Sequence, residues 1–526
     1  MACLFNLASV TDDSMCHQYV AIAIELLCTS SAVRKAVVKE GGLGPFISLS
    51  SHPSFGLKHC VAVSICLITT EETSLVYVAT EALNVLLILC KNTSINTQRK
   101  AVCALANLAD SLDTHQLLVK ARVVHELKEV ALTSVDSIIV REITRFFASI
   151  SINSIAKEQM MQSNILPHLM KFSRRSDTGT QRYSSLAMCN LSLHSKQKNT
   201  IVNQDGLMNI IIFLSKCSDL EVERCAVLTV AALALGTSTC CKESIANSGV
   251  LLTVLKAIRC PETLMKRCSS LALNSIVLSE TDSIKVKANG MMKDIPALKS
   301  LLNTPDDECI HNGVYAIGSM IESIEVRDIL ISQGCIKDVV KIANSASIEV
   351  KRACGYFFSI IAECVEYHKL MAESNALESI VNLAGLADHE CQLYGAFSLV
   401  FLSSNPDLQI PLVKLGTVRH LVSMMETDSE TRHYAGLALL KLADNFENHI
   451  QIAEDGGIQA LLKLGRSRAA DDEVQYKASI TVGNLASKAV ANLPKLSRFG
   501  ENAGAGVSSF TKISTPQKKR TRGVKK

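Results

Sequence analysis

The sequence predicts an all-helical protein built from stacked repeats, and three observations support this prediction. Its 526 residues exceed what one hydrophobic core usually organises, so the chain forms either several domains or an elongated array. Hydrophobic residues make up 48% of it, but aromatic residues only 4% and Trp none, so Leu, Ile, Val and Ala must build the core. One apolar pattern also returns about every 42 residues, and neighbouring copies of such a unit have to stack to bury their apolar faces.

The repeat is clearest in three nine-residue segments, which read AVCALANLA from Ala101, SSLAMCNLS from Ser184 and ASITVGNLA from Ala478. Their asparagine marks a position that we call the Asn column. Its occupants along the chain are Leu26, Cys66, Asn107, Ser149, Asn190, Ala232, Ser275, Ser319, Ser359, Phe401, Lys441 and Asn484. Nine intervals separate Asn107 from Asn484, and their mean length is about 42 residues, within the range of known helical repeats. The apolar residues of each copy, such as Ala104, Leu105 and Leu108, are expected to be core.

A second column, of glycines, lies at a nearly constant distance after the Asn column in many copies. Its members are Gly41, Gly42, Gly206, Gly249, Gly334, Gly416 and Gly456. Gly at a fixed place after an amphipathic stretch marks a helix end, where the backbone needs positive φ. Each unit therefore reads as a short helix ending at that Gly, a second helix such as residues 458–464, and a longer third helix such as residues 474–486.

This pattern resembles the armadillo repeat, in which the A-x-x-A-L-x-N-L-A stretch belongs to the third helix. The resemblance covers about residues 15–487. It implies an all-α, right-handed solenoid of about 11 three-helix repeats across residues 1–487, followed by a basic C-terminal tail, residues 488–526. HEAT repeats, with two helices in a similar length, are the nearest alternative, and the Gly column and the Asn-Leu-Ala ending favour armadillo. The chain looks most like the vacuolar-protein-8-like all-armadillo adaptors, with armadillo proteins of the ciliary axoneme as equal candidates.

Two irregularities interrupt the array. The segment that begins at Ala2 carries Asn6 only 20 residues before Leu26, so the first repeat is incomplete and we expect a truncated start. Residues 287–296 displace the glycine turn to Gly290, and the local spacing stretches to 44 residues between Ser275 and Ser319. A local departure from the regular repeat is expected there.

The resemblance implies that third helices line a concave groove, which in this family holds extended peptides. Candidate groove residues are Asn107, Ser149, Asn190, Ser275, Tyr315, Ser319, Ser359, Lys441 and Asn484. An Asn amide donates and accepts hydrogen bonds at once, which suits recognition of a peptide backbone. The alternative, that each Asn only satisfies local backbone groups, stays open. The mixed polar groove favours an extended or helical protein segment over nucleic acid, which would want a continuous basic stripe.

Nuclear import adaptors resemble this chain in fold but pair each groove Asn with a Trp four residues earlier. Here those positions hold Cys103, Leu186 and Ile480, and the chain has no Trp. Aliphatic side chains lack the cation–π surface that a Trp offers to Lys stems. The sequence therefore disfavours a classical import adaptor.

The C-terminal tail differs from the array in charge. The chain carries a net charge of +4, but residues 488–526 hold ten Lys or Arg and one acidic residue, which leaves −5 for residues 1–487. The final basic cluster comprises Lys518, Lys519, Arg520, Arg522, Lys525 and Lys526. Such a cluster is typical of a nuclear localisation signal or of a segment that binds anionic lipid or nucleic acid, and a solubilising end is an equal alternative. Thr515-Pro516 also looks like a proline-directed phosphorylation site that would weaken the cluster.

No catalytic pattern is found: GxxxxGK[ST], HExxH and GxSxG are absent, and the 13 His and 19 Cys lack metal-ligand spacing. We expect no enzyme, cofactor, metal or small-molecule substrate. The apolar runs are too short for a membrane span, so membranes would be contacted only indirectly, and the location expected is cytoplasmic, with the nucleus as alternative. The leading interpretation is a non-enzymatic scaffold or adaptor that binds other proteins in its groove. The alternative is a nuclear or nucleocytoplasmic transport-related protein directed by the tail.

Overall fold

The structure is a computed structural model that describes residues 3–4, 6–7, 13–40, 42–235, 238–277, 295–466 and 472–491. Every regular element among these residues is a helix, and the predicted all-helical fold is confirmed. The chain divides into two compact units, Met1–Ala297 and Leu298–Lys526, which we call unit 1 and unit 2 and describe separately.

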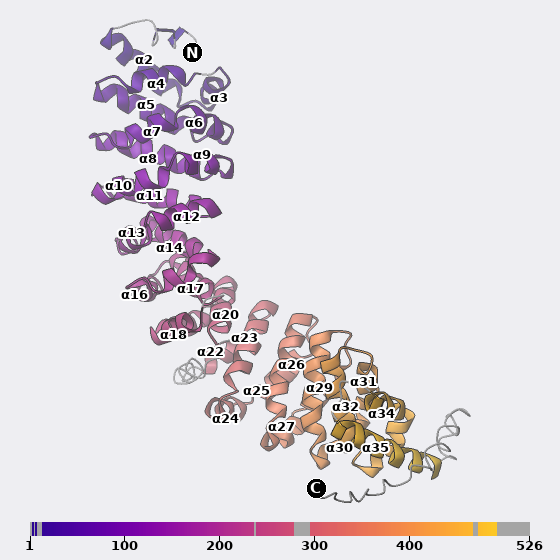
Figure 1. The fold of residues 1–526 in the computed structure, drawn as a ribbon. Coiled ribbons are helices and arrows are strands. Elements are labelled where there is room, and N and C mark those ends of the chain that lie inside the picture. Colours follow the sequence, from indigo (N-terminus) through magenta and orange to yellow (C-terminus); the bar gives the residue numbers. More distant parts are fainter. Residues whose placement is uncertain are drawn as a thin grey trace, which may run out of the picture. The chain divides into compact units, whose positions relative to one another are not determined.

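In unit 1 the helices follow one another in triplets (Figure 1). The first helices are α3 (Ser31–Lys39), α6 (Leu75–Glu81), α9 (His115–Lys120), α12 (Ser154–Gln162), α15 (Lys198–Val202) and α18 (Thr239–Asn247). The second helices are α4 (Gly44–Ser50), α7 (Leu83–Leu89), α10 (Val123–Thr133), α13 (Leu166–Phe172), α16 (Leu207–Leu214) and α19 (Val250–Ile258). The third helices are α2 (Ser14–Leu27), α5 (Phe55–Ile68), α8 (Ile95–Ala109), α11 (Ser137–Ile150), α14 (Thr178–Ser192), α17 (Leu220–Ala234) and α20 (Thr263–Val277). Short 3-10 turns, η1 (Glu72–Ser74), η2 (Leu112–Thr114) and η3 (Ser195–Gln197), precede α6, α9 and α15.

Unit 2 repeats the same order after α22 (Ile295–Leu302), which begins just before the boundary. Its first helices are α24 (Ile324–Ser332), α27 (His368–Glu373), α30 (Pro406–Lys414) and α33 (His449–Glu454), with the turns η5 (Val365–Tyr367) and η6 (Phe446–Asn448) before α27 and α33. The second helices are α25 (Cys335–Ile342), α28 (Ala376–Ala384), α31 (Thr417–Met424) and α34 (Gly457–Arg466). The third helices are α23 (Asp307–Met320), α26 (Ile348–Ala362), α29 (His389–Ser403), α32 (Ser429–Leu442) and α35 (Asp472–Ala491).

The helices predicted at 458–464 and 474–486 are confirmed as α34 and α35, both of which extend beyond the predicted ends. The boundary placed at residue 487 falls inside α35, which continues to Ala491. The irregularity expected at 287–296 lies outside the described residues except for its last two, which open α22.

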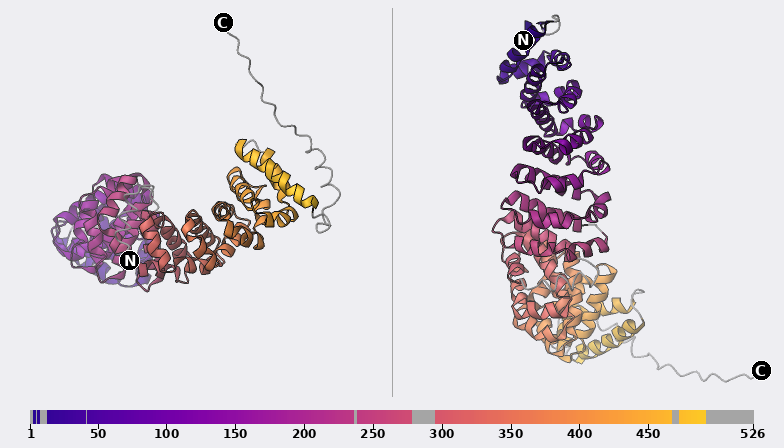
Figure 2. Two further views of the ribbon diagram at one scale, coloured as in Figure 1. Left: turned by 90° about the horizontal axis from the view of Figure 1, so that it is seen from below. Right: turned by 90° about the vertical axis from the view of Figure 1, so that its left-hand side faces the viewer.

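Consecutive third helices pack against one another within each unit: α5 through α20 in unit 1 and α23 through α32 in unit 2. In Figure 2 the right-hand view shows the triplets of unit 1 stacked on one another, and the left-hand view shows those of unit 2. The predicted core residues Ala104, Leu105 and Leu108 are fully buried in α8. Such a third helix packs against the third helix before it and the one after it. No single repeat therefore has a complete core without its neighbours.

Aspartates start most third helices. The carboxylates of Asp13, Asp136, Asp177, Asp219, Asp306, Asp388 and Asp428 each accept backbone N–H groups in the first turn of α2, α11, α14, α17, α23, α29 and α32. A capping Asp satisfies N–H groups that have no partner inside the helix, and replacing it by Ala typically costs about 1 kcal/mol.

Several of these capping acids also bind an arginine from the preceding third helix. Arg99 on α8 contacts Asp136 at 2.6 Å, Arg182 on α14 contacts Asp219 at 2.6 Å, and Arg352 on α26 contacts Asp388 at 2.8 Å. Arg224 on α17 bonds in the same way to Glu262, just before α20. These arginines lower the pKa of Asp136, Asp219 and Asp388. One carboxylate therefore begins its own helix and ties it to the previous one.

The predicted glycine column is confirmed at five of its six described members. Gly206, Gly249, Gly334, Gly416 and Gly456 have φ between +76° and +86°, each directly between a first and a second helix. Gly41 lies outside the described residues, and Gly42 is not among the glycines with positive φ. In three copies without Gly, the same turn uses Arg122, Asn164 and Asn375 at φ +51° to +60°, whereas Ala82, between α6 and α7, has φ −115°.

A third recurring device closes the ends of third helices. The ring Nε2–H of His115, His368 and His449 donates to the carbonyl six residues earlier, at 2.8, 2.7 and 2.7 Å. Gln409 donates similarly to the Ser403 carbonyl at 3.0 Å. These buried side chains satisfy carbonyls that the helix itself leaves without a partner.

All the cysteines that the structure describes are free thiols, and most of them are buried, where a thiol packs as a small apolar side chain. Among the described residues no single helix has the length and apolarity to cross a membrane, while the pair Phe55–Ile68 and Glu72–Glu81, bent by 115°, meets the criteria only jointly.

Candidate functional site

Asn107 and Ser149, both predicted groove residues, belong to one hydrogen-bond network across α5, α8 and α11. The Asn107 amide donates to the Thr69 hydroxyl at 3.1 Å and accepts from Arg145 Nη2 at 2.7 Å. The Ser149 hydroxyl donates to Asp110 Oδ1 at 2.6 Å, and Arg145 Nη1 contacts Asp110 Oδ2 at 2.9 Å. The amide oxygen and one of the two N–H groups of Asn107 are thus already bonded within the protein.

Arg145 is the centre of this network. Its Nε also bonds to Glu142 at 2.9 Å, and its side chain is only 19% exposed. Burial opposes the charged guanidinium, but Glu142 and Asp110 outweigh it and raise the pKa of Arg145. The guanidinium is therefore held in a fixed place by two carboxylates and one amide.

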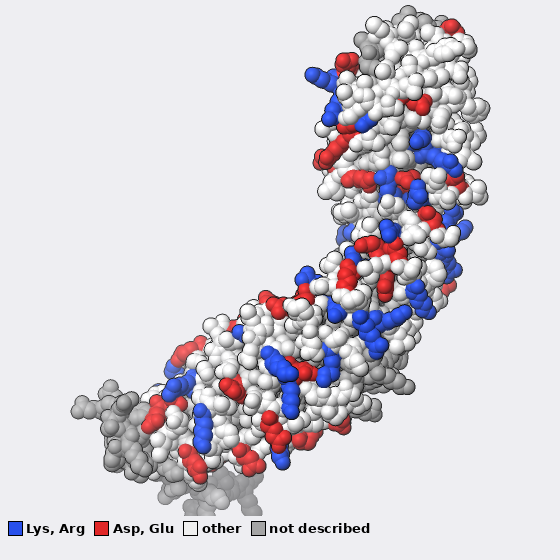
Figure 3. All heavy atoms as spheres, turned by 180° about the vertical axis from the view of Figure 1, so that it is seen from behind, with Lys and Arg blue, Asp and Glu red and all other residues white. Residues whose placement is uncertain are grey.

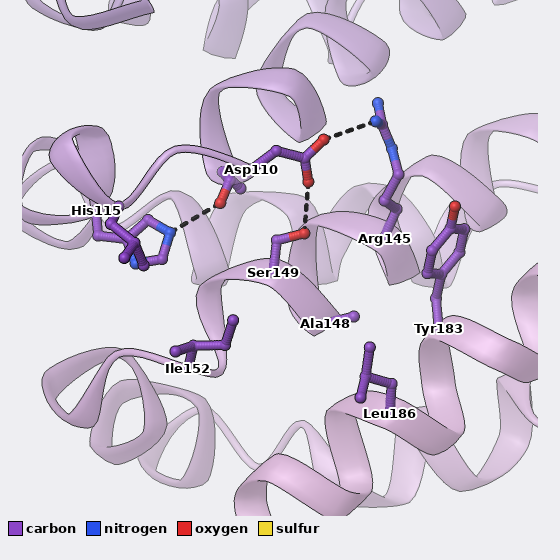
Figure 4. Close-up of a pocket in the computed structure, with 10 residues that line it drawn as sticks. Asp110, His115, Arg145, Ala148, Ser149, Ile152, Tyr183 and Leu186 are labelled. Carbon is purple, nitrogen blue, oxygen red and sulfur yellow. Dashed lines mark hydrogen bonds and ion pairs between the residues drawn. The ribbon is translucent and has the colours of Figure 1, made fainter. Parts of the chain in front are cut away.

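A pocket of about 310 Å³ opens beside this network (Figure 4). Its polar side is formed by Asp110, Arg145, Ser149 and Tyr183. Its apolar side includes Leu112, Ile152 and Leu186, which are 67%, 61% and 40% exposed. Exposed aliphatic side chains next to an ordered ion pair suit a partner that inserts one apolar side chain and hydrogen-bonds beside it.

The other predicted groove residues of unit 1 are bonded within the protein. Asn190 on α14 donates to the Ser151 hydroxyl at 3.0 Å and to the Ala148 carbonyl at 3.4 Å. Ser275 on α20 is 6% exposed and donates to the Leu271 carbonyl at 2.7 Å. Asn190 thus joins α14 to the end of α11, and Ser275 bonds within its own helix, α20.

The predicted serines of unit 2 are also buried. Ser319 is 2% exposed and lies 3.3 Å from the Tyr356 hydroxyl, while Ser359 is 6% exposed and donates to the Tyr356 carbonyl at 2.7 Å. Lys441 is half-buried on α32, and Asn484 is exposed on α35. The basic tail residues lie outside the described part of the chain, so the transport-related alternative stays a prediction.

Predicted Tyr315 belongs to a larger feature of unit 2, which we call the aromatic ridge. It consists of six half-buried side chains on α23, α26, α29 and α32: Tyr315, Tyr356, Tyr394, Phe397, Phe401 and Tyr434. Ring centroids lie 5.2 Å apart from Tyr315 to Tyr356, 5.8 Å from Tyr356 to Tyr394, and 5.1 Å from Phe397 to Tyr434. These distances are typical of packed aromatic pairs, so the rings form one surface from helix to helix.

Two glycines make this close approach possible. A Cβ on Gly318 would lie 2.8 Å from Tyr356 Cε1, and a Cβ on Gly355 would lie 3.1 Å from Tyr394 Cβ. Burial, together with the nearby carboxylate of Glu322, raises the pKa of Tyr356 to about 12, so the phenol stays neutral and donates to Glu322 at 3.2 Å.

The third helices of the two units differ in charge. Counted with the residue before and the two residues after each helix, α23, α26, α29 and α32 carry eleven acidic residues against four Lys or Arg, a net charge of −7. The same count for α5 through α20, up to Val277, gives eight acidic and nine basic residues, a net charge of +1. On the face drawn in Figure 3, acidic and basic side chains are interspersed over both units.

The sequence prediction missed Asp110, Arg145, Tyr183, Tyr356, Tyr394 and Tyr434. Arg145 stands four residues before Ser149, the offset already used to look for Trp, so a search for any large side chain at that offset would have found it. The tyrosines stand three or seven residues before the Asn column. Seven residues make about two helical turns, so these positions share its face.

No cluster of His, Cys, Asp or Glu that suits a metal ion occurs in the part of the chain that the structure describes.

Comparisons with known proteins bear on the fold. The chain is similar to the crystal structure of an engineered protein solved by the Northeast Structural Genomics Consortium, with 25% identity and a TM-score of 0.68, over 76% of this chain and 98% of that one. No model of a protein family matches the sequence, and no match is found among curated proteins. The helical-repeat architecture thus has a solved counterpart.

Proposed function

We propose that this chain is an armadillo-type protein, a right-handed solenoid of about 11 three-helix repeats, and that it acts as a non-enzymatic scaffold for other proteins. Three arguments support the family: the mean spacing of about 42 residues, the order of short, second and long third helix, and the positive-φ turn between the first two. The proposed location is the cytoplasm. The proposed partners are extended or helical protein segments, with no need for a cofactor.

The pocket of unit 1 is the observation that carries the binding proposal. Leu112, Ile152 and Leu186 remain exposed beside an ion pair whose charges are already positioned. A partner that covers these aliphatic side chains gains apolar burial worth about 25 cal/mol for each Å². The positioned Asp110 and Arg145 groups add direction without further ordering of side chains.

The test compares the proteins captured by the full-length chain with those captured by a double variant, Ile152→Glu and Leu186→Glu. Both side chains are exposed, so circular dichroism should not change, while partners that insert into the pocket should be lost. The matched control places the same two charges on second helices, as Ile88→Glu and Leu252→Glu, at residues that are 64% and 57% exposed. Equal partner lists for the two variants would refute the pocket as the binding site.

A further inference from the structure

We propose that the aromatic ridge of unit 2 binds the chain's own C-terminal basic segment, residues 512–526. This contact goes beyond the scaffold function, because it concerns a different unit and joins two parts of the same chain. Residues 512–526 contain seven Lys or Arg and no acidic residue.

Charge is the first argument. The third helices that carry the ridge have a net charge of −7, while those of unit 1 have +1, so a basic segment is attracted to the former. Glu322, Glu363 and Asp444 are exposed just after the ends of α23, α26 and α32. The carbonyl ends of these helices add negative partial charge at the same place.

The rings are the second argument. Arg and Lys bind the faces of aromatic rings through cation–π contact, and arginine also stacks on them. Half-buried rings, with the exposed Glu322 carboxylate 3.2 Å from the Tyr356 hydroxyl, therefore offer such side chains both a ring face and a negative charge. Tyr476 on α35, 42 residues after Tyr434 and 68% exposed, adds a ring to the next third helix.

The basic and titratable groups on the same helices do not cancel this attraction. Arg352 is held by Asp388 at 2.8 Å and lies 3.9 Å from Glu390, and Arg432 donates to the Thr427 carbonyl at 2.6 Å. His311 and His433 pack edge-on against Tyr315 and Tyr434, and Lys441 is half-buried. The acidic excess of −7 already counts the Lys and Arg side chains of the four helices.

The third argument is that the residues after α35 are numerous enough to extend to the aromatic ridge. The 35 residues that follow Ala491 span up to about 115 Å when extended, at about 3.3 Å per residue. Third helices packed at roughly 10 Å put α23 only about 40 Å from α35 along the stack of unit 2. A tethered segment also has an effective concentration on the order of millimolar, which favours it over a similar segment of another protein.

The first experiment is zero-length crosslinking of the full-length chain at low concentration, using a carbodiimide that joins a Lys amine directly to a carboxylate. We expect amide links from Lys518, Lys519, Lys525 or Lys526 to Glu322, Glu363, Glu390 or Asp444, and their loss at high salt. Tail links that fall mainly on carboxylates of unit 1, or that occur only between two molecules, would overturn the proposal.

The second experiment uses a synthetic peptide of residues 512–526 as a probe. A full-length variant with Ala at Lys518, Lys519, Arg520, Arg522, Lys525 and Lys526 leaves the ridge vacant, so we expect it to bind the peptide at least tenfold more tightly than the wild-type chain does. Adding Glu322→Lys, Glu363→Lys and Asp444→Lys should abolish that binding. The matched control adds Glu373→Lys, Glu378→Lys and Glu454→Lys, which are exposed and lie on first or second helices, and should retain it.

Equal peptide binding by the wild-type chain and the tail variant, or equal loss with both sets of Lys substitutions, would refute the intramolecular contact. Neither result would affect the pocket of unit 1, so failure of this proposal is distinguishable from failure of the scaffold function.

Discussion

The carboxylate of Asp136 lies 2.6 Å from the guanidinium of Arg99 while it also accepts the N–H groups of Ile138 and Ile139. Arg99 belongs to α8 and Asp136 opens α11, so one side chain serves two consecutive third helices. The arrangement returns at Arg182 with Asp219 and at Arg352 with Asp388. It holds successive repeats in register by a bond that only the stacked array can form.

Replacing Asp136 by Ala should destabilise unit 1 by about 1–2 kcal/mol, because α11 loses its N-cap, with up to about 1 kcal/mol more for the lost ion pair. Urea denaturation of Asp136→Ala, Arg99→Ala and the double variant measures both contributions. The double variant should be less destabilised than the sum of the single variants. Strictly additive effects would mean that the ion pair itself contributes nothing.

Acid should weaken the contribution of Asp388 to stability. The Arg352 guanidinium, helped by the N–H of Cys391, lowers the pKa of Asp388 from 3.8 to about 2. Because the folded pKa is the lower one, this stability is fully present above the unfolded pKa of about 3.9 and is lost as pH falls toward 2. Asp388→Asn keeps a good N-cap but has no charge. The free energy of unfolding of this variant should be lower than that of the wild-type chain by a constant amount near pH 6, and the difference should shrink between about pH 4 and 2. A difference that does not depend on pH would contradict this.

Arg122→Gly should stabilise the chain by about 0.5–1 kcal/mol. Arg122 has φ +54°, and this backbone conformation costs an L-residue about 1–2 kcal/mol. Gly relieves that strain, but it loses more backbone entropy on folding, which offsets part of the stabilisation. Gly334→Ala is the converse control, since φ is +82° and no atom lies within 4 Å of the added Cβ. Thermal melting should move up for the first variant and down for the second, and a fall for Arg122→Gly would show that its side chain does more than occupy the turn.

Asn107→Ala should destabilise unit 1 by about 1–2 kcal/mol, because the half-buried Arg145 loses an acceptor and Thr69 a donor. Asn484→Ala, at an exposed position of α35, should change stability by less than about 0.5 kcal/mol. Denaturation midpoints of the two variants check this. Unchanged stability in Asn107→Ala would instead favour a role reserved for a bound peptide.

Periodicity made much of the fold predictable from the sequence. Apolar runs like that of α8 recur at a fixed distance and indicate which residues are buried. The glycines recur at the same distance and indicate where the backbone has positive φ. The turns at Arg122, Asn164 and Asn375 were not predictable in this way, because their side chains give no glycine signal and the stacked neighbours impose the backbone.

The candidate site was less predictable, because its bonds join residues that lie on successive repeats. Whether Asn107 faces a ligand or the protein depends on Arg145 of the next third helix, which the local sequence of α8 does not contain. Of the tyrosines of the ridge only Tyr315 was predicted, since an offset of four residues samples one line on a helix face. The remaining tyrosines lie on neighbouring lines of the same face.

The shared carboxylates between third helices also bear on how the protein responds to a pulling force. When α8 unfolds, Arg99 moves away from Asp136, so α11 keeps its N-cap but loses its ion pair with the preceding third helix. Each repeat that unfolds therefore lowers the stability of the next one. A chain stretched from its ends should therefore shed repeats in sequence from a terminus, in extension steps that correspond to about 42 residues, rather than break at an interior repeat.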